Sequence, residues 1–319
     1  MEFYSSFFLN SCVCVQTKMS VNSTQVSYFI FSFYSDIGLL KYLVFFFLMC
    51  LYVIALFVNL LLIVVICMNR SLHEPMYLFL CSLFVNELWG STGLFPLLLL
   101  QILSDVHTIP VHYCYLQIFC LYIYANVDFY NLAVLSYDRY LAICCPLQYS
   151  TRMSSKKVAQ LIAMTWLIPL VVVMIMVSLN ASLKMCGNVI DRLYCDNYTV
   201  VKLACSDTTV NNVYGLIYTF IVLVGLVCLI AYTYFKILRV CLSGSKQCRQ
   251  KAMSTCIPHL ASLFNFFSGC FLEVIQSRLS MKGAPILLRI FMSLYFTVSP
   301  PIFNPLEIAL GNFSVYYCR

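Results

Sequence analysis

Seven long runs of the chain are apolar and almost free of charged residues, and more polar segments separate them. A membrane-spanning helix needs about 20 mostly apolar residues, because each residue rises about 1.5 Å through about 30 Å of hydrocarbon. The pattern therefore predicts an all-α membrane protein, a bundle of seven transmembrane helices. The predicted spans cover residues 41–68, 77–101, 113–137, 158–179, 212–238, 255–275 and 286–309.

Some of these runs contain residues that are uncommon in a plain apolar helix. The third run carries Asn126, Asp128 and Asn131, and prolines lie inside the second, fourth and seventh runs. Neighbouring helices can satisfy the backbone groups that a proline frees within a membrane. We therefore expect kinked helices at these prolines rather than interrupted spans.

The overall composition excludes a soluble fold. Hydrophobic residues make up 62% of the 319 residues and charged residues 10%, whereas a soluble domain is about half apolar and a quarter charged. Most of the 18 cysteines stand inside the apolar runs, where a cysteine packs as a small hydrophobe. The cysteine content therefore does not indicate a disulfide-rich scaffold.

Positive charge is spread unevenly over the segments between the runs. The segments after the first, third and fifth runs, with the tail after the seventh, hold 11 of the 19 Lys and Arg residues. Since Lys and Arg are enriched in cytoplasmic loops, this pattern predicts an outer N-terminus and a cytoplasmic C-terminus. The net charge of +7 reflects the same bias. The sequence lacks arrays of Lys and Arg interleaved with aromatics, so we expect no nucleic-acid partner.

The runs divide the chain into three parts: an extracellular N-terminal tail (1–40), a seven-helix core (41–311) and a short cytoplasmic tail (312–319). The first 18 residues are apolar but lack a basic start and a small-residue cleavage site, so they make a poor signal peptide. Met19 opens the segment MSVNST, and we expect translation to begin there.

Cysteines gather on the predicted outer side of the membrane. Three lie between the fourth and fifth runs, and another stands at the outer end of the third run. Disulfides persist in an oxidising compartment, and four cysteines allow three pairings, between which spacing alone cannot choose. The cysteines are Cys114, Cys186, Cys195 and Cys205, and glycosylation sequons lie in or near outer segments at Asn22, Asn180 and Asn197.

Two acidic residues lie deep within predicted spans. Counted from the cytoplasmic ends of the second and third runs, Glu87 and Asp128 lie roughly 18 Å and 16 Å deep. Acids at that depth are costly and mark function by default. One interpretation is a bound cation; the other is a pair of protonated carboxyls bonded to polar neighbours such as Asn131 or Asn304.

Five sequence motifs together indicate a family. The chain carries PMYLFL at 75–80, LSYDRYLAICCPLQY at 135–149, CGNVIDRLYCD at 186–196, KAMSTCIPHL at 251–260 and SPPIFNP at 299–305. With seven spans and an outer N-terminus, these resemble the vertebrate olfactory receptors, which are class A, rhodopsin-like G-protein-coupled receptors. The similarity runs from about residue 24 to 311. The residues around the first motif, PMYLFLCSLFVNEL, resemble those of the fish or amphibian branch of the family, which is close to the class I olfactory receptors.

The resemblance implies a receptor that binds a small odorant in the outer half of the bundle. It further implies activation of a heterotrimeric G protein of the olfactory, stimulatory type that raises cAMP, and a place in the plasma membrane. In such receptors the arginine corresponding to Arg139 pairs with the acid Asp138 to hold the closed state, and is freed on activation. The implied coupling residues are Asp138, Arg139, Tyr140, Lys251, Ser254, Thr255, Asn304 and Pro305.

The resemblance also assigns the cysteines and the buried acids. It implies one disulfide between Cys114 and Cys195 and a second between Cys186 and Cys205. The positions that match Glu87 and Asp128 form a sodium pocket that favours the inactive state, so sodium is the one bound ion that we expect, with no other cofactor.

Helical spacing and the resemblance together predict the ligand pocket. Phe267 matches an aromatic residue of the family that changes position on activation, and Arg278 matches an arginine that binds a carboxylate in class I receptors. A carboxylate or amino acid ligand would follow, although Arg278 could instead only anchor the helix at the interface, and each pocket residue could be packing filler. The predicted ligand-binding residues are Leu121, Tyr122, Ala125, Asn126, Phe267, Cys270, Phe271, Val274 and Arg278.

The end of the chain departs from the family pattern. The family continues the seventh span as NPxxY and a basic helix, whereas this chain has Glu307 and Ile308 after Asn304-Pro305-Leu306 and soon ends. A decayed or truncated receptor that does not signal is therefore an alternative. A transporter would need paired half-helices or an internal repeat, neither of which is visible. An enzyme is not expected, because the four histidines are scattered without metal-ligand spacing.

Overall fold

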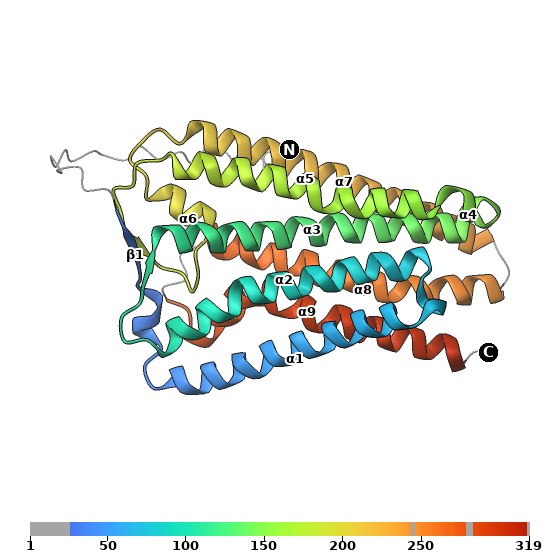
Figure 1. The fold of residues 1–319 in the computed structure, drawn as a ribbon, viewed down its shortest axis with the longest axis horizontal. Coiled ribbons are helices and arrows are strands. Elements are labelled where there is room, and N and C mark those ends of the chain that lie inside the picture. Colours follow the sequence, from blue (N-terminus) through green and yellow to red (C-terminus); the bar gives the residue numbers. More distant parts are fainter. Residues whose placement is uncertain (1–25, 244–245, 279–282, 318–319) are drawn as a thin grey trace.

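The computed structural model describes residues 26–243, 246–278 and 283–317, with side chains described except at 35, 36, 223, 246–255, 277, 278 and 307–317. Long helices run side by side along one axis (Figure 1). They are α1 (Leu40–Met68), α2 (Pro75–Leu103), α3 (Val111–Cys144), α5 (Ser155–Ala181), α7 (Thr209–Ser243), α8 (Lys246–Arg278) and α9 (Ile286–Tyr317). Among the described residues, seven helices are long and apolar enough to cross a membrane, which confirms the predicted fold class.

The helices extend beyond the apolar runs that predicted them. α3 reaches Cys144 and the helical turns of α8 begin at Lys246, whereas the runs end at 137 and begin at 255. Hydropathy marks only the part of a helix that lies in hydrocarbon, so polar end turns escape it. The helices continue through Pro96, Pro169 and the prolines of α9 without a break.

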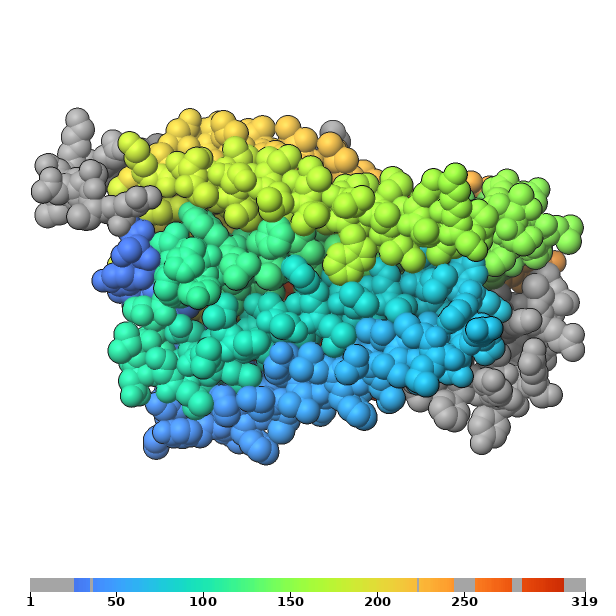
Figure 2. Space-filling model, in the orientation of Figure 1, coloured from blue at the N-terminus to red at the C-terminus, as the bar shows by residue number. Residues whose placement is uncertain are grey.

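The helices differ in how much of their surface the bundle covers. In the most apolar stretch of each helix, 61% of the residues of α3 are buried, against 17% for α1 and α5. Large apolar side chains such as Phe46, Phe57 and Val171 are exposed on α1 and α5. In Figure 2, α1 lies along the lower margin of the face and α5 along its upper part, with α7 visible above part of α5. Since lipid is as apolar as these side chains, the exposed stripes are the lipid-facing surface.

Close packing at the centre depends on small residues. Gly90 of α2 lies against the ring of Tyr124 in α3, and a Cβ at this position would overlap that ring. Small residues let membrane helices approach closely. The contact brings α2 and α3 together beside the buried acids Glu87 and Asp128.

The two ends of the bundle are built differently (Figure 1). One end, here called the sheet end, carries β1 (Tyr28–Phe31), β2 (Thr108–Pro110), β3 (Val189–Ile190), η1 (Phe33–Asp36) and α6 (Asn197–Lys202). The other, the Arg139 end, carries α4 (Tyr149–Arg152) with the short 3-10 turns η2 (Arg70–Leu72) and η3 (Pro146–Gln148). The predicted ligand and coupling sites lie toward these two ends.

β1 is the central strand of the small sheet. It pairs antiparallel with β2, with Tyr28 opposite Pro110, and parallel with β3, with Ile30 opposite Val189. Phe29, Phe31 and Phe33 are almost fully buried in the apolar cluster below the sheet. The predicted tail therefore ends in a folded segment, which covers the sheet end of the bundle.

Two disulfides fix the segment between α5 and α7. Cys195 is bonded to Cys114 in the first turn of α3, and Cys186 is bonded to Cys205. These are the two pairs that the resemblance implied. Cys114 and Cys195 are buried within the cluster that also holds β1, so the first bond ties α3 to the sheet end.

Candidate functional site

Arg139, near the end of α3, pairs with the adjacent Asp138. Arg139 Nε donates to Asp138 Oδ2 over 3.1 Å, and Arg139 Nη2 contacts the same oxygen. The other carboxylate oxygen accepts a 2.8 Å hydrogen bond from Tyr149 Oη. Burial and then the charge of Asp138 raise the pKa of Tyr149 above its ordinary value, so this hydroxyl remains a donor. Asp138 therefore bonds Arg139 through one carboxylate oxygen and Tyr149 through the other.

Side chains of α7 and α8 converge on Arg139. The hydroxyl of Tyr234 in α7 bonds Nδ1 of His259 in α8, and their rings stack at 5.8 Å between centroids. Tyr234 and His259 both interact electrostatically with the guanidinium of Arg139. Tyr140 lies beside α7, with its ring 6.3 Å from that of Tyr232. Three helices therefore meet around one guanidinium at this end.

The other predicted coupling residues divide into two groups. Asn304 and Pro305 are buried in α9, and Asn304 Nδ2 donates to Glu87 Oε1 over 2.6 Å, which places Asn304 with the buried acids. The side chains of Lys251, Ser254 and Thr255 lie outside the described residues, so their predicted role stays a prediction.

The two acids predicted at similar depth do lie together. Glu87 and Asp128 are fully buried, and the two carboxyl groups interact electrostatically. Both oxygens of Asp128 and both polar atoms of Asn131 have no hydrogen-bond partner among the described residues. Of the two polar neighbours expected from the sequence, only Asn304 bonds an acid.

The predicted pocket residues of α3 lie on its middle turns. Leu121 is buried, and Tyr122, Ala125 and Asn126 are half-buried. Asn126 Oδ1 accepts a 2.7 Å hydrogen bond from Tyr218 Oη of α7, and its amide donates to the Tyr122 carbonyl. The structure therefore assigns Asn126 a polar partner that the sequence pattern did not identify.

The predicted pocket face of α8 is partly wrong. Phe267 and Cys270 are half-buried against the cluster around Phe129, but Phe271 and Val274 are 65% and 47% exposed. They share a helical stripe with Phe264, which is 76% exposed, so they belong to the lipid-facing surface. The prediction placed Phe267 at the centre of the inward face of α8, whereas the buried residues lie one position away, at Phe266 and the residues in line with it.

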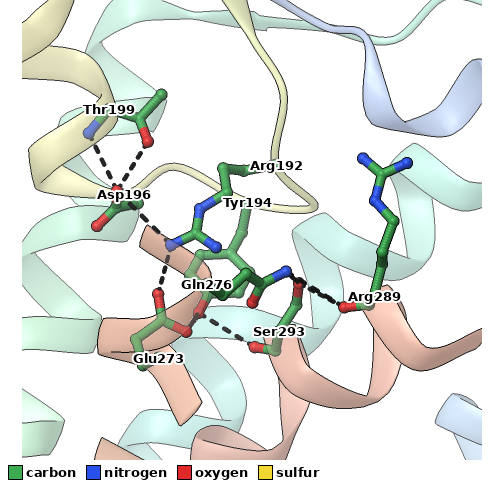
Figure 3. Close-up of polar contacts among 8 residues, drawn as sticks. All are labelled: Arg192, Tyr194, Asp196, Thr199, Glu273, Gln276, Arg289 and Ser293. Atoms are coloured by element: carbon green, nitrogen blue, oxygen red, sulfur yellow. Dashed lines mark hydrogen bonds and ion pairs between the residues drawn. The ribbon is translucent and has the colours of Figure 1, made fainter. Parts of the chain in front are cut away.

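That buried stripe runs through residues spaced by three and four positions on α8, and brings two polar side chains inward. Ser262, Phe266 and Gly269 are buried along it, and Glu273 and Gln276 continue it toward the sheet end (Figure 3). Because side chains at these spacings share one face of a helix, the stripe defines the side of α8 that contacts the bundle.

Glu273 is the centre of a polar network between α8, α9 and the segment after β3 (Figure 3). Arg192 Nη2 lies 2.8 Å from Glu273 Oε1, and Tyr194 Oη donates to Glu273 Oε2 over 3.1 Å. Arg192 also lies 3.9 Å from Asp196, whose carboxylate caps α6 by accepting from Thr199. Burial opposes the charge of Arg192, but Glu273 and Asp196 outweigh it and raise its pKa. The guanidinium therefore stays protonated.

A second ion pair joins α9 to the same loop. Arg289 Nη2 lies 3.2 Å from Asp191 Oδ1, and its guanidinium lies over the Phe33 ring at 4.3 Å. Tyr34 Oη donates to the Leu193 carbonyl over 2.5 Å. The N-terminal segment, the loop after β3 and α9 are thus linked at the sheet end.

One predicted glycosylation site is not available in the folded protein. Asn180 is 1% exposed, its amide contacts Asn197, and its oxygen accepts a 2.9 Å hydrogen bond from Asn211. A buried, bonded amide leaves no space for a glycan, so Asn180 is a structural residue. Asn197 is half-buried and occupied by the same bond, and Asn22 lies outside the described residues.

Sequence reasoning missed Glu273 and Arg192 as site residues and gave Arg278 a role instead. Arg278 ends α8, and its side chain lies outside the described residues. The signal for Glu273 was present, since an acid in a predicted span is costly and functional by default. Tyr149 and His259 stand within the motifs at 135–149 and 251–260, which was a signal for them, whereas Tyr234 lies in an apolar run and carried none.

Known proteins resemble this chain over most of its length. A family model described as olfactory receptor matches residues 48–316. Olfactory receptor 6E1 of Mus musculus is 33% identical over 293 residues, covering 91% of this chain and 93% of that protein. Olfactory receptor 11A1 of Homo sapiens is 36% identical over 300 residues, covering 92% of this chain and 93% of that protein.

A solved structure shares the arrangement of the helices. The crystal structure of squid rhodopsin matches 84% of this chain and 76% of its own, with a TM-score of 0.67 and 16% sequence identity. At that identity the likeness concerns the fold alone. It is the fold of a seven-helix receptor.

Proposed function

Because the chain belongs to the olfactory receptor family, we propose that it binds a small odorant in the sheet-end half of the bundle and signals from the Arg139 end. The chain is an odorant-sensing G-protein-coupled receptor, a multi-pass protein of the plasma membrane and not an enzyme. Its partners are a small-molecule ligand and a heterotrimeric G protein. The proposal concerns the ligand site, the orientation and the switch.

The orientation in this proposal puts the sheet end outside the cell. Two disulfides lie at that end, and disulfides persist in oxidising compartments. Lys and Arg residues outside the spans are more numerous toward the opposite end, as cytoplasmic loops require. Both observations favour a cytoplasmic Arg139 end, where a G protein can reach it.

The observation that carries the proposal is the bonded group of Asp138, Arg139 and Tyr149 at the meeting point of α3, α7 and α8. The ion pair and the Tyr149 hydrogen bond stabilise one arrangement of these helices. An agonist that separates α8 from α3 would free Arg139 for a G protein, which makes the group a two-state element. The G protein is proposed to be the stimulatory type that raises cAMP.

The test is a panel of odorants of matched length, carrying amine, alcohol or carboxylic acid groups, applied to cells that display the receptor. We expect at least one to raise cAMP in a dose-dependent manner. The Asp138→Asn variant, in which the amide no longer pairs as a charge with Arg139, should raise cAMP without ligand. A surface-displayed receptor for which neither happens would contradict the proposed function.

The finer identity of the ligand is also a proposal. A carboxylate or amino acid was predicted from Arg278, and a guanidinium presents a planar fork that matches a carboxylate. The side chain of Arg278 lies outside the described residues, so this proposal rests on the sequence alone. Whether the atypical end of α9, with Glu307 and Ile308, permits signalling is decided by the same panel.

Sodium binding between Glu87 and Asp128 is proposed as a brake on activation. Both oxygens of the buried Asp128 have no hydrogen-bond partner among the described residues. Glu87 Oε1 accepts a hydrogen bond from the Asn304 amide, and Glu87 Oε2 has no hydrogen-bond partner among the described residues. Oxygen ligands with negative charge suit a hard cation. The residues present therefore fit the ion, which would bridge α2 and α3 and oppose their rearrangement.

Replacing NaCl by KCl should raise basal GTP exchange in membranes that contain the receptor, on the order of tenfold if the ion is present at about ten times its dissociation constant. The reason is that an ion that binds only the inactive state shifts the equilibrium toward that state by a factor of one plus the ratio of its concentration to its dissociation constant. Asp128→Asn should remove the difference between the two salts. Equal exchange in both salts for the unmodified receptor would favour the protonated pair instead.

A further inference from the structure

The network around Glu273 carries an excess of acidic groups. One guanidinium, Arg192, faces two carboxylates, Glu273 and Asp196, so the three residues have one more acidic group than basic groups. Asp196 has donors of its own in the backbone and hydroxyl groups of Thr199. Each oxygen of Glu273 accepts one hydrogen bond, from Arg192 and from Tyr194, and a carboxylate has about four lone-pair sites, so Glu273 can accept further donors.

A second acceptor beside Glu273 has no donor. Gln276 is 9% exposed, and its Nε2 donates to Ser293 Oγ over 2.5 Å, but its Oε1 is buried without a hydrogen-bond partner among the described residues. An unpaired buried acceptor is costly. Glu273 and Gln276 are three positions apart, so they lie on one face of α8, and Figure 3 places both beside Tyr194. The face thus offers two acceptors that a ligand with several N–H donors would satisfy.

The network adjoins the ligand site predicted on α3. Tyr122, one of the predicted pocket residues, interacts electrostatically with Asp196, Glu273 and Arg192. The Glu273 side chain is 24% exposed, against 9% for Arg192 and 10% for Asp196. The accessible part of the network is therefore its acidic member, on the side of α8 that contacts the bundle.

We infer that Glu273 binds the protonated amine of the odorant, with Gln276 Oε1 as a second acceptor, so that the ligands are small primary amines or amino acids. The inference rests on the proposed function and specifies its ligand. An ammonium group has three donors and no acceptor, which matches two acceptors and a surplus acidic group. A ligand carboxylate would be repelled by Glu273 and Asp196, so the carboxylate of an amino acid would have to lie away from this face of α8.

The experiment compares hexylamine, hexanol and hexanoic acid, with an amino acid of similar length, on the unmodified receptor and on Glu273→Gln. Potency is read from cAMP dose–response curves at equal surface density. We expect amines to activate the unmodified receptor, and Glu273→Gln to weaken them about ten- to a hundredfold, the range of a hydrogen bond to a charged group. Responses to hexanol, where present, should change less than responses to hexylamine, because a neutral hydroxyl makes a weaker hydrogen bond to Glu273 than an ammonium group does.

Arg192→Gln is the control for a purely structural role of Glu273. It breaks the same ion pair but leaves the acid, so amine potency should be retained or should rise as a competing cation is removed. Glu273→Asp keeps the charge on a shorter side chain and should recover part of the potency. Equal losses in Glu273→Gln and Arg192→Gln would mean that Glu273 only holds the loop, and the inference would be wrong.

Two outcomes separate this inference from the proposed function. If alcohols or acids activate the receptor but amines do not, the inference is overturned and the function stands. If Asp138→Asn reaches the surface and activates no G protein, the proposed function itself fails. A Glu273→Gln variant that is absent from the surface is replaced by Glu273→Asp, whose amine potency should fall while its response to hexanol does not.

Discussion

Replacing Arg139 by alanine should abolish G-protein activation in a receptor that still reaches the cell surface. Arg139 is the cation around which α3, α7 and α8 meet, and it is 13% exposed beside a fully buried Asp138. Contacts to a charged group are worth about 1.5–3 kcal/mol each, so loss of the guanidinium should lower the agonist response by at least about tenfold. GTP exchange on the G protein, at matched surface density, measures it.

Two neighbouring changes serve as controls, because they should act in the opposite direction. Asp138→Asn and Tyr149→Phe each remove a partner of the closed arrangement while leaving Arg139 in place. Both should raise basal exchange, Tyr149→Phe the less, since it removes one hydrogen bond of about 1 kcal/mol. Adding Arg139→Ala to Asp138→Asn should return exchange to background. Full activity in that double variant would show that Arg139 is not the coupling group.

Serine at Cys114 or Cys195 should remove most of the receptor from the cell surface. The bond closes a loop of 81 residues, and both cysteines are buried where β1, α3 and the loop after β3 pack together. Loss of a native disulfide costs about 2–5 kcal/mol in small secreted domains, which is a large part of the usual 5–15 kcal/mol of folding stability. Flow cytometry with an N-terminal tag, compared with total expression, measures the loss.

The chain provides two matched comparisons for this prediction. Cys120 lies in the same helix, partly buried and free, so Cys120→Ser should leave surface density nearly unchanged. Cys186 and Cys205 are exposed and close a loop of only 19 residues, so their loss should cost less because loop-closure entropy is smaller. Equal surface density of Cys114→Ser and Cys120→Ser would contradict the structural role of the bond.

The parts of the molecule that could be predicted are those governed by local composition. Seven apolar runs specify seven helices because lipid requires each run to satisfy its own backbone hydrogen bonds. The strand β1 also had a local signal that a search for helices passes over. Its sequence, YFIF, consists of aromatic and β-branched residues, which are enriched in strands.

The rest depended on rotation of helices and on contacts between distant segments. Whether Phe271 or Glu273 faces inward depends on a rotation of α8 by about 200°. The polar residues Ser262, Glu273 and Gln276 mark the inward face, but the interpretation took its register from Phe267 instead. The pairing of Arg192 with Glu273 joins residues 81 positions apart. The sequence of the loop after β3 does not indicate that it contacts α8, and the sequence of α8 does not indicate this loop. The network could therefore be identified only in the folded structure.

The central position of β1 has a consequence for biosynthesis. Its segment is made first, yet Ser32 and Tyr34 bond to residues that are synthesised 159 positions later. At about 5–20 residues per second, Phe29, Phe31 and Phe33 wait on the order of ten to thirty seconds for β3 to be made. During that interval the nascent chain presents aromatic side chains of the kind that chaperones bind, and completion of the sheet hides them. Burial of β1 is therefore a mark by which a cell can distinguish a finished receptor from an unfinished one before export.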